Sequence, residues 1–156
     1  MVALDEIDRT ILSELQQDAS RSTQEIADLV GLSQNACWRR IRRLETDGII
    51  RARVALVDPV ALGKPLIVFV SVRTTQHSPE WLDRFAAAVR EIPEVIELHR
   101  MTGDIDYLLK IVAADVAEYD RIYKRLIRAV ELHDVSSSFV MEPIKSTTAI
   151  PLPPAR

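Results

Sequence analysis

The stretch that decides the fold is SQNACWRRIRRLETDG, residues 33–48. Ser33 favours a helix start because its hydroxyl can accept a hydrogen bond from a free backbone amide of the first turn. Gly48 favours a helix end because glycine adopts the left-handed conformation without strain. The sequence therefore predicts a helix that runs to about Asp47.

The two sides of this helix differ in chemistry. At 100° per residue, its apolar side chains fall within about 40° of one another and are expected to be buried; they are Cys37, Ile41 and Leu44. The opposite side carries polar and basic residues, which are Asn35, Arg39, Arg42 and Thr46, flanked by Gln34, Trp38 and Arg43. Such a face suits the DNA major groove, because Arg pairs with guanine, Asn or Gln pairs with adenine, and other cations hold phosphates. Ser33 lies at the helix N-terminus, where free backbone amides can bind a phosphate.

Two residues of the same helix allow a second interpretation. Arg40 lies beside the buried stripe and is expected to form an internal ion pair with an acid of the preceding helices. Trp38 either contacts a sugar-phosphate edge or packs on a neighbouring helix. The general alternative for the whole face is a charged helix surface that is merely solvated.

Two shorter helices are expected upstream. Apolar residues recur at helical spacing from Asp5 to about Asp18, with acids in the first turn. Ser22 caps a second helix that Gly31 ends. Two helices joined by a turn at residues 31–33 predict a helix-turn-helix.

The charge distribution agrees with this interpretation. The chain has 156 residues and a net charge of −3, which alone argues against a nucleic-acid partner. Residues 33–53, however, hold six arginines and two acids, a net of +4, between segments of −5 (1–32) and −2 (54–156). Local asymmetry indicates the partner better than net charge does. We therefore expect double-stranded DNA to bind this segment.

Residues 49–57 alternate in part and are expected to form a strand. This strand is either a wing whose arginines reach the DNA backbone or a plain connection between domains. The turn-rich residues 58–64 follow as a hinge. The predicted domains are thus 1–57, which binds DNA, and 65–156.

The second domain has the pattern of a ferredoxin-like sandwich. Strands are expected at residues 66–75, 95–101, 107–112 and 135–141, with helices that begin near Ser78 and Asp115. Residues 145–150 are expected to add an edge strand. The order βαββαβ places both helices on one face of the sheet and leaves the other face apolar and open, which favours oligomerisation. The fold class is α+β.

Composition indicates the cellular compartment. One cysteine excludes an intrachain disulfide and favours a reducing compartment. No apolar run approaches the roughly 18 residues of a membrane span. We therefore expect a cytoplasmic protein.

Several of these motifs together resemble one family. The segments are Leu4–Leu12, Gln17-Asp18, Val30–Ser33, Arg40–Glu45, Asp47–Ile50, Thr102–Lys110 and Phe139–Lys145. They are similar to the Lrp/AsnC, or leucine-responsive and feast/famine, transcriptional regulators. The resemblance covers nearly the whole chain. It implies a winged-helix-like DNA-binding domain, an effector domain of ferredoxin-like fold, and homodimers that assemble further, often to octamers.

The resemblance also implies an amino-acid effector bound between dimers. The residues that match the family pocket are Met101, Thr102, Gly103, Asp104, Asp106 and Tyr107, with Ser136 and Ser137 from a neighbouring subunit. Gly103 would let backbone approach a carboxylate, the acids suit an ammonium group, and Tyr107 would close the pocket. Trp38, Pro79–Trp81 and the three consecutive serines resemble a branch that responds to cysteine or another sulfur amino acid. From the residues alone, the same turn is a tight hairpin.

An enzyme is not expected. Three scattered histidines and one cysteine on a buried stripe provide no nucleophile–base pair and no set of metal ligands. We predict no cofactor. The sequence thus favours a sequence-specific, effector-modulated regulator, and the alternative is an architectural oligomer that coats DNA with little sequence preference.

Overall fold

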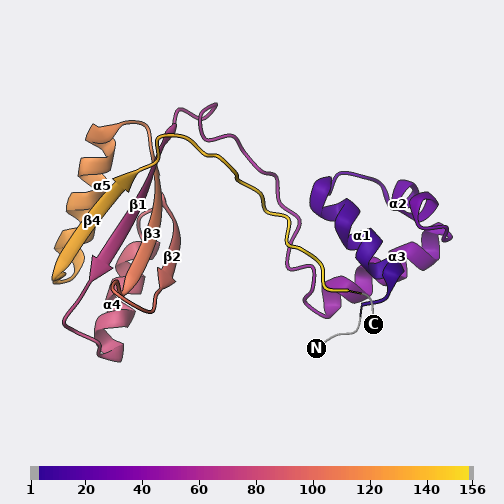
Figure 1. Ribbon diagram of the computed structural model, residues 1–156, viewed down its shortest axis with the longest axis horizontal. Helices are drawn as coiled ribbons and strands as arrows, with labels where there is room; N and C mark the ends of the chain where they lie inside the picture. The colour runs from indigo at the N-terminus through magenta and orange to yellow at the C-terminus, as the bar shows by residue number, and fades with distance from the viewer. Residues whose placement is uncertain (1–3, 155–156) are drawn as a thin grey trace. The chain divides into compact units, whose positions relative to one another are not determined.

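The computed structural model describes residues 4–154. Its first three helices are α1 (Glu6–Gln17), α2 (Thr23–Leu29) and α3 (Gln34–Thr46) (Figure 1). Asp5 and Ser22 each form a reciprocal capping box, and the Ser33 hydroxyl accepts from the Ala36 amide. The predicted helix-turn-helix is therefore confirmed.

One small core holds these helices together. Its buried apolar residues come from all three helices and are Ile11, Leu12, Ile26, Ala27, Cys37, Ile41 and Leu44. The predicted stripe of α3 is thus fully buried. The opposite side of α3 faces solvent, so a ligand can reach the helix only from that side.

The second unit is a four-stranded antiparallel sheet in the order β2-β3-β1-β4. The strands are β1 (Leu66–Arg73), β2 (Val95–Arg100), β3 (Tyr107–Ala113) and β4 (Asp134–Phe139), and the helices are α4 (Pro79–Arg90) and α5 (Val116–Ala129). Side chains of both helices pack in one core with the same alternating strand residues, among them Val68, Val70 and Val72. This is the predicted ferredoxin-like arrangement.

Within the unit of residues 56–144, no helix covers the other face of the sheet. The strand alternation and register put partly exposed apolar residues there, which are Ile67, Phe69, Leu108 and Val112. Polar residues surround them: Glu97, His99 and Lys110 on one side, and Ser71, Ser136 and Ser138 on the other. Within residues 4–154, no helix is long and apolar enough to cross a membrane.

Two expected strands are absent from the described chain, so these predictions are wrong. Residues 49–57 form no wing: the amides of Ile49 and Ile50 bond to the carbonyl of Leu44 and extend the end of α3. From residue 51 onward the segment is irregular and has no neighbouring strand for pairing. Residues 145–150 add no edge strand, because their contacts lie elsewhere.

Those contacts are with α1. Gln16 Nε2 donates to the Ile150 carbonyl (3.1 Å), and the Ile150 amide donates to Gln16 Oε1 (2.6 Å). Leu152 packs against the helical core. The chain accordingly forms two compact units, one containing residues up to Ala55 and the segment from Lys145, the other Leu56–Ile144. The sequence-based boundary at residue 65 assigns the segment from Lys145 to the second domain, whereas the structure places it in the helical unit.

Candidate functional site

All seven predicted DNA-contacting residues are exposed on α3 or at its cap, on the sides away from the buried stripe. The burial pattern follows directly from helical spacing, because the stripe recurs every three or four residues. Burial raises the pKa of the Cys37 thiol, which therefore stays neutral in the core. The exposed side is thus free to present arginines and amides to a partner.

The outer side of α3 is partly organised before any ligand binds. The guanidinium of Arg42 lies over the Trp38 ring, 5.6 Å from its centroid, and Arg42 Nη1 donates to Glu45 Oε2 at 3.1 Å. Trp38 is half exposed, and its ring lies under the Arg42 guanidinium on this face. Arg39 has no ion pair among the described residues. This face therefore presents Arg42, which is held by Trp38 and Glu45, next to Arg39, which forms no ion pair in the described part of the chain.

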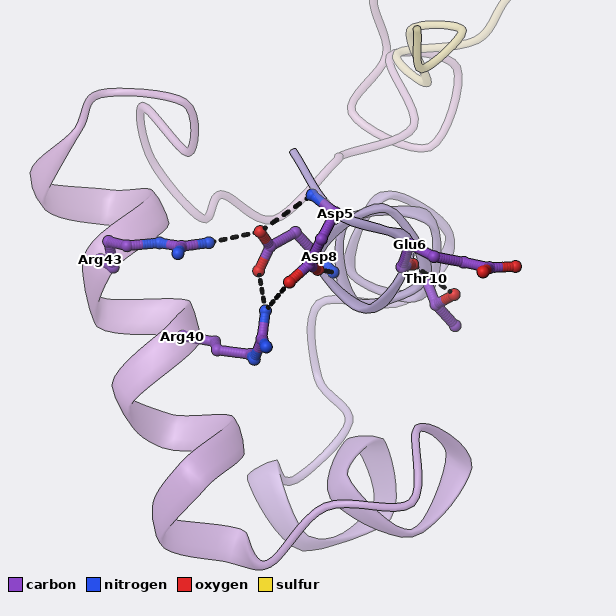
Figure 2. A network of polar contacts seen from close by, with 6 residues as sticks. All are labelled: Asp5, Glu6, Asp8, Thr10, Arg40 and Arg43. Carbon is purple, nitrogen blue, oxygen red and sulfur yellow. Dashed lines mark hydrogen bonds and ion pairs between the residues drawn. The ribbon is translucent and has the colours of Figure 1, made fainter. Parts of the chain in front are cut away.

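Behind this face, α3 is joined to α1 by an ion-pair network (Figure 2). Arg40 Nη1 donates to Asp5 Oδ2 (2.6 Å) and to Asp8 Oδ1 (2.9 Å), and Arg43 donates to the other Asp8 oxygen. The side chain of Asp8 is 1% exposed. The expected internal ion pair of Arg40 is confirmed, whereas Arg43, predicted for DNA, is also engaged inward.

The network shifts two protonation equilibria. The Asp8 amide, followed by Arg40, lowers the pKa of Asp5, since both stabilise the carboxylate. Hydrogen bonds to Asp5 and then Asp8 raise the pKa of Arg40. Sequence reasoning did not identify Asp8, although it stands three and four residues before Ile11 and Leu12. That spacing puts a carboxylate on the buried face of α1, where it needs a cation.

The second predicted site is the turn between β2 and β3. Met101, Thr102, Gly103 and Asp104 are exposed there. Gly103 has φ +101°, which disfavours any residue with a Cβ, and a Cβ would meet no atom within 4 Å. The turn therefore depends on glycine for its backbone and leaves open space beside it.

Two residues expected to contact the effector have structural roles instead. Tyr107 is 4% exposed, and its ring lies 5.6 Å from Trp81 and 5.2 Å from Phe85. One Asp106 oxygen accepts from the Thr74 amide at 2.8 Å, and the other lies 3.9 Å from His77 Nδ1. The alternation with buried Leu109 and Ile111 was the signal that puts Tyr107 in the core.

The two serines expected from a neighbouring subunit cannot line the same surface. Ser136 pairs with Ser71 and Ser137 with Val70, so the two side chains point to opposite faces of the sheet. The Ser137 hydroxyl hydrogen-bonds with the Tyr119 hydroxyl on the helix-covered face. Ser136 is exposed on the open face.

An exposed arginine face on a helix-turn-helix, joined to a separate ferredoxin-like unit, defines a class of two-domain DNA-binding regulators. Family models match on both sides: the AsnC-type helix-turn-helix domain over residues 4–45 and the Lrp/AsnC ligand binding domain over residues 67–150. The chain belongs to the Lrp/AsnC family of transcriptional regulators. It is a DNA-binding regulator and not an enzyme.

Individual relatives agree. The chain is 53% identical over 150 residues to the glutamate uptake regulatory protein of Zymomonas mobilis, covering 96% of this chain and 92% of the relative. It is 49% identical to the DNA-binding transcriptional activator DecR of Escherichia coli, covering 96% and 99%. The fold matches a transcriptional regulator of Neisseria meningitidis solved as an L-Met complex, with TM-score 0.90, 34% identity and coverage of 96% and 97%.

Proposed function

We propose that α3 reads operator DNA in the major groove. Asn35, Arg39 and Arg42 stand opposite the buried stripe and would face bases, while Gln34, Trp38 and Arg43 flank them towards the backbone. Ser33 would place the first amides of α3 near a phosphate. The observation that supports this assignment best is the exposure of all seven residues on one helix whose other side is buried.

The test requires a duplex selected from a random library by the wild-type protein. Arg39→Ala and Arg42→Ala should each weaken binding by about 5- to 150-fold, the value of one specific base contact at roughly 1–3 kcal/mol. Arg128→Ala, an exposed arginine of α5, is the matched control and should bind as the wild type does. Unchanged affinity in both α3 variants, with normal circular dichroism, would refute the groove assignment.

We also propose an amino-acid effector at the turn of residues 101–104. The exposed turn, the conformation of Gly103 and the carboxylate of Asp104 support this placement, as does the L-Met complex of the Neisseria relative. A sulfur amino acid, cysteine among them, is the preferred candidate. Ser136 of a second copy stays in the proposal, whereas Tyr107, Asp106 and Ser137 are removed from it because their side chains are engaged inside the unit.

A thermal-shift screen of the twenty amino acids tests the effector, because a ligand that binds only the folded state raises the apparent stability by mass action. At least one amino acid should stabilise the wild type, and Asp104→Ala should lose that shift while it retains DNA binding. If no amino acid stabilises the protein, the effector assignment fails.

We further propose that the protein works as a homodimer that assembles to an octamer in the cytoplasm, on the nucleoid. The uncovered apolar residues of the sheet favour burial against a second copy. Light scattering after size exclusion should give a dimer or a multiple of it, and Phe69→Glu should lower the mass. A wild-type monomer at micromolar concentration would exclude this assembly.

A further inference from the structure

A shallow hollow lies on the surface of α3 beside the residues assigned to DNA. It has a volume of about 320 Å³ and is lined by Ala36, Arg39, Arg40 and Arg43. Three of the four lining side chains carry a guanidinium group, whose planar donors match phosphate oxygens. The chemistry of this hollow therefore suits a phosphate.

The three arginines differ in how firmly they are held. Arg40 bonds two carboxylates and its side chain is 27% exposed. Arg43 bonds one carboxylate, that of Asp8, and its side chain is 46% exposed. Arg39 has no ion pair among residues 4–154. Arg43 is thus the one engaged cation of the hollow that a competing anion could release at small cost.

Asp8 permits that release. A buried carboxylate that loses its only cation is strongly destabilising. If Arg43 leaves, however, Asp8 keeps Arg40 at 2.9 Å and the Asp5 amide at 3.4 Å. The reverse exchange, in which Arg40 leaves, would break the contacts with two acids at once. The geometry therefore favours movement of Arg43 over movement of Arg40.

We propose that the hollow is the seat of one DNA backbone phosphate and that Arg43 exchanges Asp8 for this phosphate when the protein binds DNA. Asp8 is then a positioning residue: it keeps Arg40 in place and sets the cost of releasing Arg43. The inference rests on the proposed function of α3. It specifies how Arg43 makes the backbone contact proposed above and gives the buried ion pair a role in affinity.

The first experiment measures the salt dependence of binding of the full-length protein to the selected duplex. Each phosphate contact contributes about −0.9 to the slope of log K against log salt concentration. Arg43→Gln should therefore reduce the magnitude of the slope by about 0.9, for selected and random duplexes alike. An unchanged slope would overturn the proposal.

The second experiment measures whether Asp8→Asn raises or lowers the affinity for DNA. Asp8→Asn should raise DNA affinity about fivefold, since Arg43 no longer has to leave an ion pair. That gain should vanish in the Arg43→Gln background. Glu6→Gln is the matched control, because it removes one charge from the same helix while its side chain points away from the arginines (Figure 2). Its smaller gain should persist in that background.

A gain from Asp8→Asn that persists in Arg43→Gln would refute the exchange, as would a loss of affinity in a folded Asp8→Asn protein. If Asp8→Asn does not fold, the salt slope of Arg43→Gln decides alone. Inorganic phosphate, titrated at constant ionic strength, should not displace the duplex. Displacement that disappears in Arg43→Gln would assign the hollow to a free phosphate instead and overturn the DNA assignment.

The Arg39→Ala and Arg42→Ala variants distinguish failure of the groove assignment from failure of the phosphate seat. If neither weakens binding, the groove assignment of α3 fails. If both weaken binding while the Arg43→Gln slope equals that of the wild type, only the phosphate seat fails.

Discussion

The helical unit and the sheet unit are held together by different chemistry. Among the described residues, seven buried apolar residues form the helical core and fifteen form the sheet core, where the Trp81 ring stacks on Phe85 and Tyr107 meets Phe85 edge-on. The smaller core is supplemented by the buried carboxylate of Asp8 and its two arginines. Ion pairs can exchange partners with an external ligand, whereas apolar packing cannot. Within residues 4–154, the helical unit is thus the one whose core contains a buried, ion-paired carboxylate.

The largest effect is expected in the aromatic core of the sheet unit. Phe85→Ala should lower the free energy of unfolding of this unit by about 3–5 kcal/mol through lost burial and a cavity. Urea unfolding followed by Trp81 fluorescence in a Trp38→Phe background measures it. Lys124→Ala, which removes an exposed ion pair, should change stability by less than about 0.5 kcal/mol. A Phe85→Ala loss as small as that of the control would contradict the comparison.

An intermediate effect is expected at Gly103, in the turn between β2 and β3. Gly103→Ala should cost about 1–2 kcal/mol of unfolding free energy, since φ +101° disfavours a Cβ although no atom lies within 4 Å of one. Gly31→Ala, at φ +66° in the helical unit, tests the same backbone cost in the other region and should lose about 1 kcal/mol. Thermal unfolding measures both. If Gly103→Ala is as stable as the wild type, the turn does not require glycine.

The smallest effect concerns the contact between α1 and the tail. Gln16→Ala removes two hydrogen bonds to Ile150 and should cost about 1 kcal/mol, because both groups are near solvent. Amide hydrogen exchange at Ile150 should become faster. The neighbouring Gln17→Ala, whose side chain is exposed, should leave that rate unchanged. Equal exchange rates in the two variants would show that Gln16 does not hold the tail.

The faces of α3 could be predicted from sequence because helical periodicity and capping are local properties. The fold of the sheet unit could also be predicted, since strand alternation and the βαββαβ order are visible in one chain. The pairing of Arg43 with Asp8 could not, because helical spacing puts Arg43 on the flank of the exposed face and does not show which arginines of α3 reach a given acid of α1. The opposite orientations of Ser136 and Ser137 also follow from strand alternation, whereas the family resemblance implies that both contact the effector.

The contact of Gln16 and Leu152 has a practical consequence for work on the isolated DNA-binding region. The helical unit is built from two separated pieces of sequence, with the sheet unit inserted between them. A fragment that stops at Ala55 would expose the apolar surface that Leu152 covers. A faithful minimal fragment is therefore bipartite, with residues 145–154 joined to it by a short linker or supplied as a peptide.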